Sequence, residues 1–385
     1  MSLTVIYGQE APPVGFSKSI FLIGPSPRAA SVQSWRPEAI RILAEMGYDG
    51  VVFVPEPRGE RKDDLGPDGY LNQVDWEEEC MNMADIIMCW LPRDPQTMPG
   101  FTTNVELGMW IDSGKMVFGG PVGAYKNRYI EHLSNKRKVP VAHTLEDTVA
   151  NALELLGDGA WRVGGEREVP LLVWRTPHFQ QWYQARIAAQ EVLEHARLVW
   201  THRIGPDRRT VFFWVLWAEI YITSEDRRKS NEVVLSRPDI STIVLYHNGT
   251  DINSTNIVLV EEFRTPGGQV VAPPGGSSHH CADHLVVAAE ECHEETGLQI
   301  DPERFVFHGS RQIQATLSAQ LCHLYSVRLS YEELEWLRAQ EAAGIVHGIE
   351  ADTERTRLRI TTLGEIRAAN RLDWSMLGML LEVIA

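Results

Sequence analysis

The sequence predicts an α/β protein of two domains: a doubly wound parallel sheet, followed by a mixed sheet with helices on both faces. The length of 385 residues exceeds that of one ordinary domain. Short apolar runs alternate with helical patterns in the first half, which is typical of parallel strands joined by right-handed crossovers. Glycines cluster between residues 157 and 165, and longer apolar runs follow. We therefore expect domains at 1–157 and 171–385, joined by a glycine-rich linker at 158–170.

The first domain is expected to contain four buried strands, at residues 19–24, 51–54, 85–91 and 115–118. Thr144 is a suitable cap for a helix that continues to Leu156, with Asp147 in its first turn. Ligands of such sheets bind beyond the carboxyl ends of the strands. We expect the residues that end or follow these strands to share that rim, namely Gly24, Pro25, Asp85 and the segment 102–108.

In the second domain we expect a helix at 179–198, core strands at 240–246 and 257–260, and an acidic helix that ends before Gly297. Glu291, Glu294 and Glu295 share one face of this helix, with Glu290 beside them. Like charges at this spacing destabilise a helix by about 0.2–0.5 kcal/mol per pair. A divalent cation with oxygen ligands, such as Mg²⁺, would reverse that effect. A solvated acidic surface is the alternative.

The stretch 276–298 resembles a Nudix box, and residues 257–276 match the strand and Gly-Pro turn that precede it in that family. The spacing is intact, but Ala282 replaces the first Glu and Glu290 replaces the Arg. The resemblance implies an α/β/α sandwich and cleavage of a nucleoside diphosphate derivative by a metal-activated water. It also implies site residues: Mg²⁺ or Mn²⁺ on Glu291, Glu294 and Glu295, catalysis by Glu295 or a loop acid, and substrate at Arg264, Gly275 and Gly276.

The altered box leaves three interpretations open. The two changes can compensate each other, or they can reflect decay of activity, which would leave a nucleotide-sensing module that regulates the first domain. A third interpretation is a transition-metal site, because the residue types near the start of the helix include suitable donors. Their spacing matches no standard zinc pattern. These residues are His279, His280, Cys281, Asp283 and His284.

The first domain resembles the nucleoside 2-deoxyribosyltransferase family, particularly its nucleotide N-glycosidase-like branch, over residues 18–155. The resemblance rests on six short motifs, at 21–25, 34–38, 73–77, 84–86, 90–93 and 103–108. It implies a flavodoxin-like or Rossmann-like sheet, with Glu106 as the nucleophile at the anomeric carbon. Asp85 would bind the base or protonate the leaving group. Glu106 is expected at a helix start, where backbone amides would lower its pKa; an ordinary N-terminal helix acid is the alternative.

Arg36 beside Trp35 suggests a cation for a 5′-phosphate and an aromatic face for a base. Core packing is the alternative for Trp35. Gly24, Pro25, Thr103 and Asn104 complete the expected substrate-binding set. Phe21 stands where the family often has Tyr, and Gly100 or its neighbours replace an acidic residue. Both departures argue against base exchange between deoxynucleosides.

Composition restricts the partners. The net charge of −16 disfavours nucleic acid, whose backbone requires a basic surface. Five scattered cysteines without a signal peptide indicate the cytoplasm, and no apolar run is long enough to span a membrane. Family resemblance implies that the first domain can form a homo-oligomer. The two resemblances together imply a bifunctional nucleotide-processing hydrolase. One half would cleave a nucleoside diphosphate derivative with Mg²⁺, and the other would cleave the N-glycosidic bond of a small nucleoside or nucleotide or transfer its (deoxy)ribosyl group.

Overall fold

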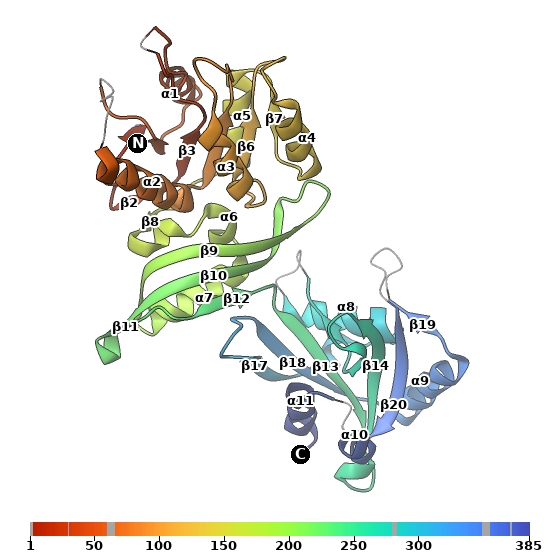
Figure 1. Ribbon diagram of the computed structural model, residues 1–385. Coiled ribbons are helices and arrows are strands. Elements are labelled where there is room, and N and C mark those ends of the chain that lie inside the picture. The colour runs from red at the N-terminus through yellow and green to blue at the C-terminus, as the bar shows by residue number, and fades with distance from the viewer. Residues whose placement is uncertain (1–2, 30, 60–65, 279–282, 349–354, 370–371) are drawn as a thin grey trace. The chain divides into compact units, whose positions relative to one another are not determined.

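The computed structural model describes residues 3–29, 31–59, 66–278, 283–348, 355–369 and 372–385. The chain divides into two compact units, Met1–Leu235 and Ser236–Ala385 (Figure 1). This division differs from the expected boundary at 158–170, because residues 158–235 belong to the first unit. No helix among the described residues is both long and apolar enough to cross a membrane.

The first unit contains the predicted parallel sheet. Its six strands have the order β1-β4-β3-β5-β6-β7, and every neighbouring pair is parallel. The four predicted strands correspond to β3, β4, β5 and β6, so alternation of apolar runs with helices identified the sheet correctly. The strands are β1 (Thr4–Tyr7), β3 (Ser19–Ile23), β4 (Val51–Val54), β5 (Ile86–Trp90), β6 (Met116–Gly119) and β7 (Val141–Ala142).

Helices cover both faces of this sheet. On one face α1 (Arg36–Glu45) and α5 (Leu145–Leu156) pack through Ile42 and Val149. The other face is covered by α2 (Gly66–Met83), α3 (Phe101–Trp110) and α4 (Arg128–Lys136). The predicted cap of α5 is confirmed, since the Thr144 side chain accepts a hydrogen bond from the amide of Asp147.

The rest of the first unit is a long hairpin with short helices. Strands β9 (Val192–Ile204) and β10 (Thr210–Ile222) pair antiparallel, and Phe179 and Trp214 belong to the hydrophobic cluster beside them. The shorter elements are β2 (Gly15–Phe16), β8 (Arg162–Val163), η1 (Gly164–Glu168), α6 (Leu171–Trp174), α7 (Pro177–Ala188), η2 (Thr223–Glu225), β11 (Arg227–Lys229) and β12 (Val233–Ser236).

The predicted helix at 179–198 is wrong in its second half. Helix α7 ends at Ala188, and Gln190 has a left-handed backbone with φ of 59°. The following residues pair with β10, which places Leu193 and Ala196 in the hydrophobic cluster. Tertiary pairing therefore overrides the local helical preference of this segment.

The expected linker is folded onto the sheet. Arg162 is 0% exposed, and its guanidinium binds both carboxylate oxygens of Asp85 at 2.8 and 2.7 Å. Asp85 also accepts hydrogen bonds from the Ser19 amide and from the Leu171 amide. The buried Asp85 carboxylate thus connects β3 and the start of β5 to α6 and to the segment that was expected to be a linker.

Replacing Asp85 with alanine should lower the free energy of unfolding of the first unit by about 3–5 kcal/mol, because it leaves the buried Arg162 charge without its partner. Denaturant titration followed by tryptophan fluorescence measures this change. The control is Asp49→Asn, which affects a surface pair with Lys18 and should cost about 0–1 kcal/mol. Equal effects of the two substitutions would contradict the structural role of Asp85.

The second unit is an eight-stranded mixed sheet. Its order is β17-β18-β13-β14-β20-β19, with β15 on β14 and β16 on β13; β13 and β18 are parallel, and the other pairs are antiparallel. The strands are β13 (Ile240–His247), β14 (Asn256–Arg264), β15 (Gly268–Ala272), β16 (Gly275–Gly276), β17 (Val306–Gln312), β18 (Leu321–Arg328), β19 (Val346–His347) and β20 (Thr356–Thr362).

Helices again cover both faces, as the sequence predicted. One face packs α8 (His284–Thr296) and α9 (Tyr331–Ala343), and the other packs α10 (Leu363–Ala369) and α11 (Trp374–Ile384). Short 3-10 turns, η3 (Ile252–Ser254) and η4 (Pro302–Arg304), connect some of the strands and helices. Gly297 ends α8 with φ of 72°, which confirms the predicted left-handed cap.

Candidate functional site

The carboxyl ends of β3 and β5 form the predicted rim of the first unit. Gly24 follows β3, where a Cβ atom would lie 2.3 Å from the carbonyl oxygen of Trp90 and 2.7 Å from the Trp35 ring. Pro25 lies against Gly100, the N-cap residue that precedes α3 and has a left-handed φ of 62°. The close approach at Gly24 and the left-handed turn at Gly100 thus bring the loop after β3 to the start of α3.

Glu106 lies in the second turn of α3, because this helix already begins at Phe101. The expected position at a helix start is therefore wrong, and so is the expected lowering of its pKa. The pKa of Glu106 is raised to about 7, mainly by burial and also by the nearby negative charge of Glu77, whereas the positive charge of Arg36 opposes the shift.

Glu77, on α2, is a further candidate site residue, which the sequence alone did not single out. Burial raises the pKa of its carboxyl, and hydrogen bonding to Gln73 and the charge of Arg36 oppose that shift. Gln73, one turn earlier, donates its side-chain amide to Glu77 at 2.8 Å. The available signal was the motif at 73–77, in which Glu77 follows the buried Trp76. The rim therefore combines two half-buried acids whose charges interact.

Arg36 and Trp35 stabilise the loop after β3. The Arg36 side chain is 1% exposed and donates to the carbonyl oxygens of Leu22 and Gly24, to the Ser26 hydroxyl, and to Glu56 at 2.6 Å. Trp35 donates its indole N–H to the Pro25 carbonyl and packs in the core.

For Trp35 the structure agrees with the core-packing alternative rather than with a base-stacking face. The Arg36 guanidinium is surrounded by protein acceptors, so it affects the rim mainly through its charge.

The two polar residues of α3 differ in exposure. Thr103 is 1% exposed, whereas Asn104 is exposed and accepts a hydrogen bond from Arg93. Of this pair, only Asn104 presents its side chain to solvent at the rim.

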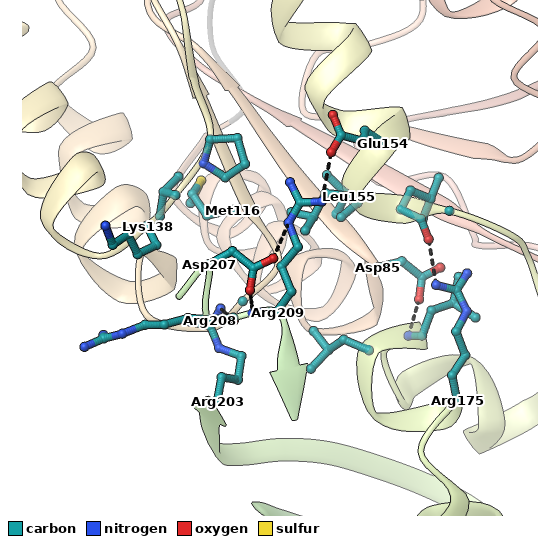
Figure 2. Close-up of a pocket in the computed structure, with 18 of the residues that line it drawn as sticks. Asp85, Met116, Lys138, Glu154, Leu155, Arg175, Arg203, Asp207, Arg208 and Arg209 are labelled. Atoms are coloured by element: carbon teal, nitrogen blue, oxygen red, sulfur yellow. Dashed lines mark hydrogen bonds and ion pairs between the residues drawn. The ribbon is translucent and has the colours of Figure 1, made fainter. Parts of the chain in front are cut away.

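Asp85 does not lie at the rim. It precedes β5, so the length of that strand, about 16 Å at 3.3 Å per residue, separates it from the carboxyl end. Asp85 instead lines a cavity of about 320 Å³ at the amino ends of the strands (Figure 2). Arginines are prominent there, and Arg209 forms ion pairs with Glu154 and Asp207. The expected place of Asp85 beside Glu106 is wrong, because its carboxylate is bound by Arg162.

In the second unit, two acids of α8 lie against β16. Glu295 is 3% exposed and accepts a hydrogen bond from the Gly275 amide at 2.8 Å. The Glu291 carboxylate lies against Gly276, where a Cβ atom would be 2.2 Å from its Oε1. Glu294 is exposed on the same helix. These side chains offer only carboxylate oxygens, a donor type that fits Mg²⁺ or Mn²⁺.

Two arginines lie near the same turn. Arg237 donates to the Ser277 hydroxyl at 3.2 Å, and burial together with the charge of Arg264 lowers the pKa of Arg237. Arg264 also forms an ion pair with Glu262. Arg237 was not identified from the sequence, since only the tertiary fold brings it to this turn.

The structure describes only some of the residues that were expected to bind a transition metal. His279, His280 and Cys281 lie outside the described residues, as does the altered box position Ala282. Asp283 is described and caps α8 by accepting from the amides of Leu285 and Val286.

Gly276→Ala should displace the Glu291 carboxylate and weaken Mn²⁺ binding while changing the free energy of unfolding little, since the displaced atoms end a flexible side chain. Gly275→Ala is the matched comparison. Its Cβ would meet the backbone of Ser241 and Thr242, so it should destabilise the unit. Calorimetric Mn²⁺ titration and denaturation measure the two effects, and unchanged Mn²⁺ affinity in Gly276→Ala would contradict the role of Glu291.

A comparison with known families matches residues 17–123 to the family described as nucleoside 2-deoxyribosyltransferase like. A search of curated proteins found no match to the chain. The matched range contains β3, β4, β5 and β6, together with both acids of the rim. The first unit therefore contains a nucleoside 2-deoxyribosyltransferase-like domain at residues 17–123.

Proposed function

We propose that the chain is a bifunctional nucleotide-processing enzyme. Its first unit cleaves the N-glycosidic bond of a nucleoside or nucleotide, and its second unit is a Nudix-type hydrolase of a nucleoside diphosphate derivative. The observation that carries the proposal is the pair of half-buried acids, Glu77 and Glu106, within the family match. The two activities would act on successive bonds of one class of compound.

Glycosidic cleavage passes through an oxocarbenium-like state, which an ionised carboxylate beside the anomeric carbon can trap. Ionised Glu106 attacks the anomeric carbon, while the carbon–nitrogen bond breaks and its electron pair passes to the base. The leaving base takes up a proton from water, and the negative charge of Glu77 sets the pH at which Glu106 ionises. Water then hydrolyses the sugar ester on Glu106. Because burial and the negative charge of Glu77 disfavour ionisation of Glu106, this carboxyl keeps its proton up to a pH of about 7.

Glu106→Gln should lower the rate of base release by about 10²–10⁴-fold, because the amide cannot attack the anomeric carbon. Chromatography of products from a panel of nucleotides measures the rate. The folded-state pKa of Glu106, about 7, exceeds its ordinary value of 4.5. Wild type therefore loses stability as the pH rises through that interval, and Glu106→Gln should be the more stable protein at pH above 7. An inactive variant with lower stability would indicate misfolding and contradict this assignment.

The pH dependence tests the interaction between the two acids. In wild type, kcat/KM for base release should rise through pH of about 7 as Glu106 ionises. Glu77→Gln removes a neighbouring negative charge, so it should move this rise to lower pH. Glu78→Gln, at an exposed position of α2, should retain the wild-type profile. A profile of Glu77→Gln that rises at the wild-type pH would exclude the interaction.

For the second unit, Glu291, Glu294 and Glu295 would hold Mg²⁺ or Mn²⁺, which when bound polarises the phosphate and activates a water. Glu295 holds the Gly275 amide and so positions the turn beside the acids. Arg237 and Arg264 would neutralise the charge of a pyrophosphate near that turn. Because Glu290 replaces the Arg of the box, a sensor without turnover is the second candidate.

Glu295→Gln should abolish metal-dependent cleavage of a nucleoside diphosphate derivative, because it removes a metal oxygen and disturbs the turn. Glu290→Gln, exposed on the same helix, should retain the wild-type rate at saturating metal. Phosphate release and calorimetric nucleotide binding are measured together. Nucleotide binding without turnover in wild type would favour the sensor over the hydrolase.

A further inference from the structure

Three potential metal ligands converge in the second unit near the start of α8. The side chains of Asp239, His284 and His323 offer ligand atoms that all lie within 4.8 Å of one another. They come from the residue before β13, the first residue of α8 and the third residue of β18. We propose that Asp239, His284 and His323 form a mononuclear transition-metal site, with zinc as the ion that best matches these donors.

Strand pairing positions the carboxylate. The parallel register of β13 and β18 pairs Ile240 with Cys322, so Asp239 lies beside the start of β18. The Leu321 amide donates to Asp239 Oδ1 at 2.8 Å, and Oδ2 lies 3.3 Å from His323 Nε2. The backbone thus holds one oxygen and directs the other toward the imidazole.

A neighbouring strand orients His323, which is 4% exposed. Ser310 pairs with it across β17 and β18, and the Ser310 hydroxyl lies 2.6 Å from His323 Nδ1. With Nδ1 engaged by this hydroxyl, Nε2 is the nitrogen that faces Asp239. A second hydrogen bond that fixes the ring orientation is typical of metal-binding histidines.

His284 is positioned through the backbone of α8. Its carbonyl oxygen accepts a hydrogen bond from the Ser241 hydroxyl at 2.7 Å. Its ring stacks on His323 with centroids 3.3 Å apart and an interplanar angle of 17°. Burial and the proximity of His323 lower the pKa of His284, whereas the charges of Asp239 and Asp283 oppose the shift. The neutral imidazole is the form that binds metals.

The donor set selects the class of ion. Two imidazoles and one carboxylate suit zinc and related transition ions, whereas Mg²⁺ prefers oxygen ligands. At metal–nitrogen distances of 2.0–2.1 Å, two ligand atoms of a tetrahedral ion lie about 3.4 Å apart. The ligand atoms here lie within 4.8 Å of one another, so small side-chain rotations would bring them to that distance. Three protein ligands leave one position for water or substrate.

This site is separate from the proposed Mg²⁺ site. Glu291 lies seven residues beyond His284 on the same helix. That separation corresponds to about 10 Å along the helix axis. The inference therefore does not depend on the Nudix-type activity, and the two sites can be tested independently.

The test uses the full chain after removal of metals by a chelator, titrated with zinc in excess Mg²⁺ by calorimetry and with Co²⁺ by visible absorption. Wild type should bind one zinc per chain. Asp239→Asn, His284→Gln and His323→Gln should each weaken binding by at least about 100-fold, and Ser310→Ala by about 10–100-fold. His308→Gln, a half-buried histidine on β17 that contacts Ser326, should retain the wild-type affinity.

Zinc affinity that is equal in wild type and all three ligand variants would overturn the proposal, as would the absence of zinc binding. If a variant fails to fold, the Co²⁺ spectrum of wild type decides. Nitrogen and oxygen ligands give tetrahedral bands without sulfur-to-metal charge transfer, whereas a sulfur band would assign the ion to cysteine and refute the site. Ser310 contacts His323, which in turn contacts Asp239. Labelling of Ser310 by a fluorophosphonate, in protein that does not bind zinc, would therefore identify a serine nucleophile and overturn the proposal.

Discussion

The buried ion pair between Asp85 and Arg162 is the interaction on which the first unit depends. Both side chains are nearly inaccessible to solvent, and the carboxylate also accepts hydrogen bonds from Ser19 and Leu171. This one group therefore connects the amino ends of two central strands to the segment that precedes the long hairpin. Loss of either partner would destabilise the fold, because the remaining charge would be buried without compensation. The ion pair also explains why Asp85 is unsuited to chemistry at the rim, since its oxygens already accept hydrogen bonds from five donor atoms of Ser19, Arg162 and Leu171 at the other end of β5.

Among the described residues, the half-buried acids of the rim, in contrast to Asp85, have no ion pair with an arginine that would favour their ionised form. Arg36 is held by backbone carbonyls and Glu56, whereas Glu106 and Glu77 are half-buried with raised pKa values. Ionisation of these acids costs stability, and such costs are typical of sites that perform acid–base chemistry. Asp85 stabilises the fold at the amino ends of the strands, and the carboxyl ends hold Glu106 and Glu77, the two acids to which we assign the proposed chemistry.

In the second unit, β13 connects both candidate metal sites. Ser241 pairs with Gly276 beside Glu291, and its hydroxyl also holds the first residue of α8. Helix α8 therefore presents imidazole at its start and carboxylates near its end, with one strand fixing both positions. Hard and borderline metal ions differ in preferred donors, so the two ends of this helix can select different ions.

The sequence by itself determined the features that depend on chain neighbours: the parallel strands, the Thr144 cap, the Gly297 cap and the acidic face of α8. Local periodicity and capping are sufficient for these, because the interacting residues lie within a few positions of one another. Only the tertiary structure decided which residues meet over long separations. Asp85 and Arg162 are 77 residues apart, and Asp239 and His323 are 84 apart. Strand β9 likewise formed where the local pattern favoured a helix, because pairing with β10 buries Leu193 and Ala196. Such contacts depend on strand order and register, which no local pattern specifies.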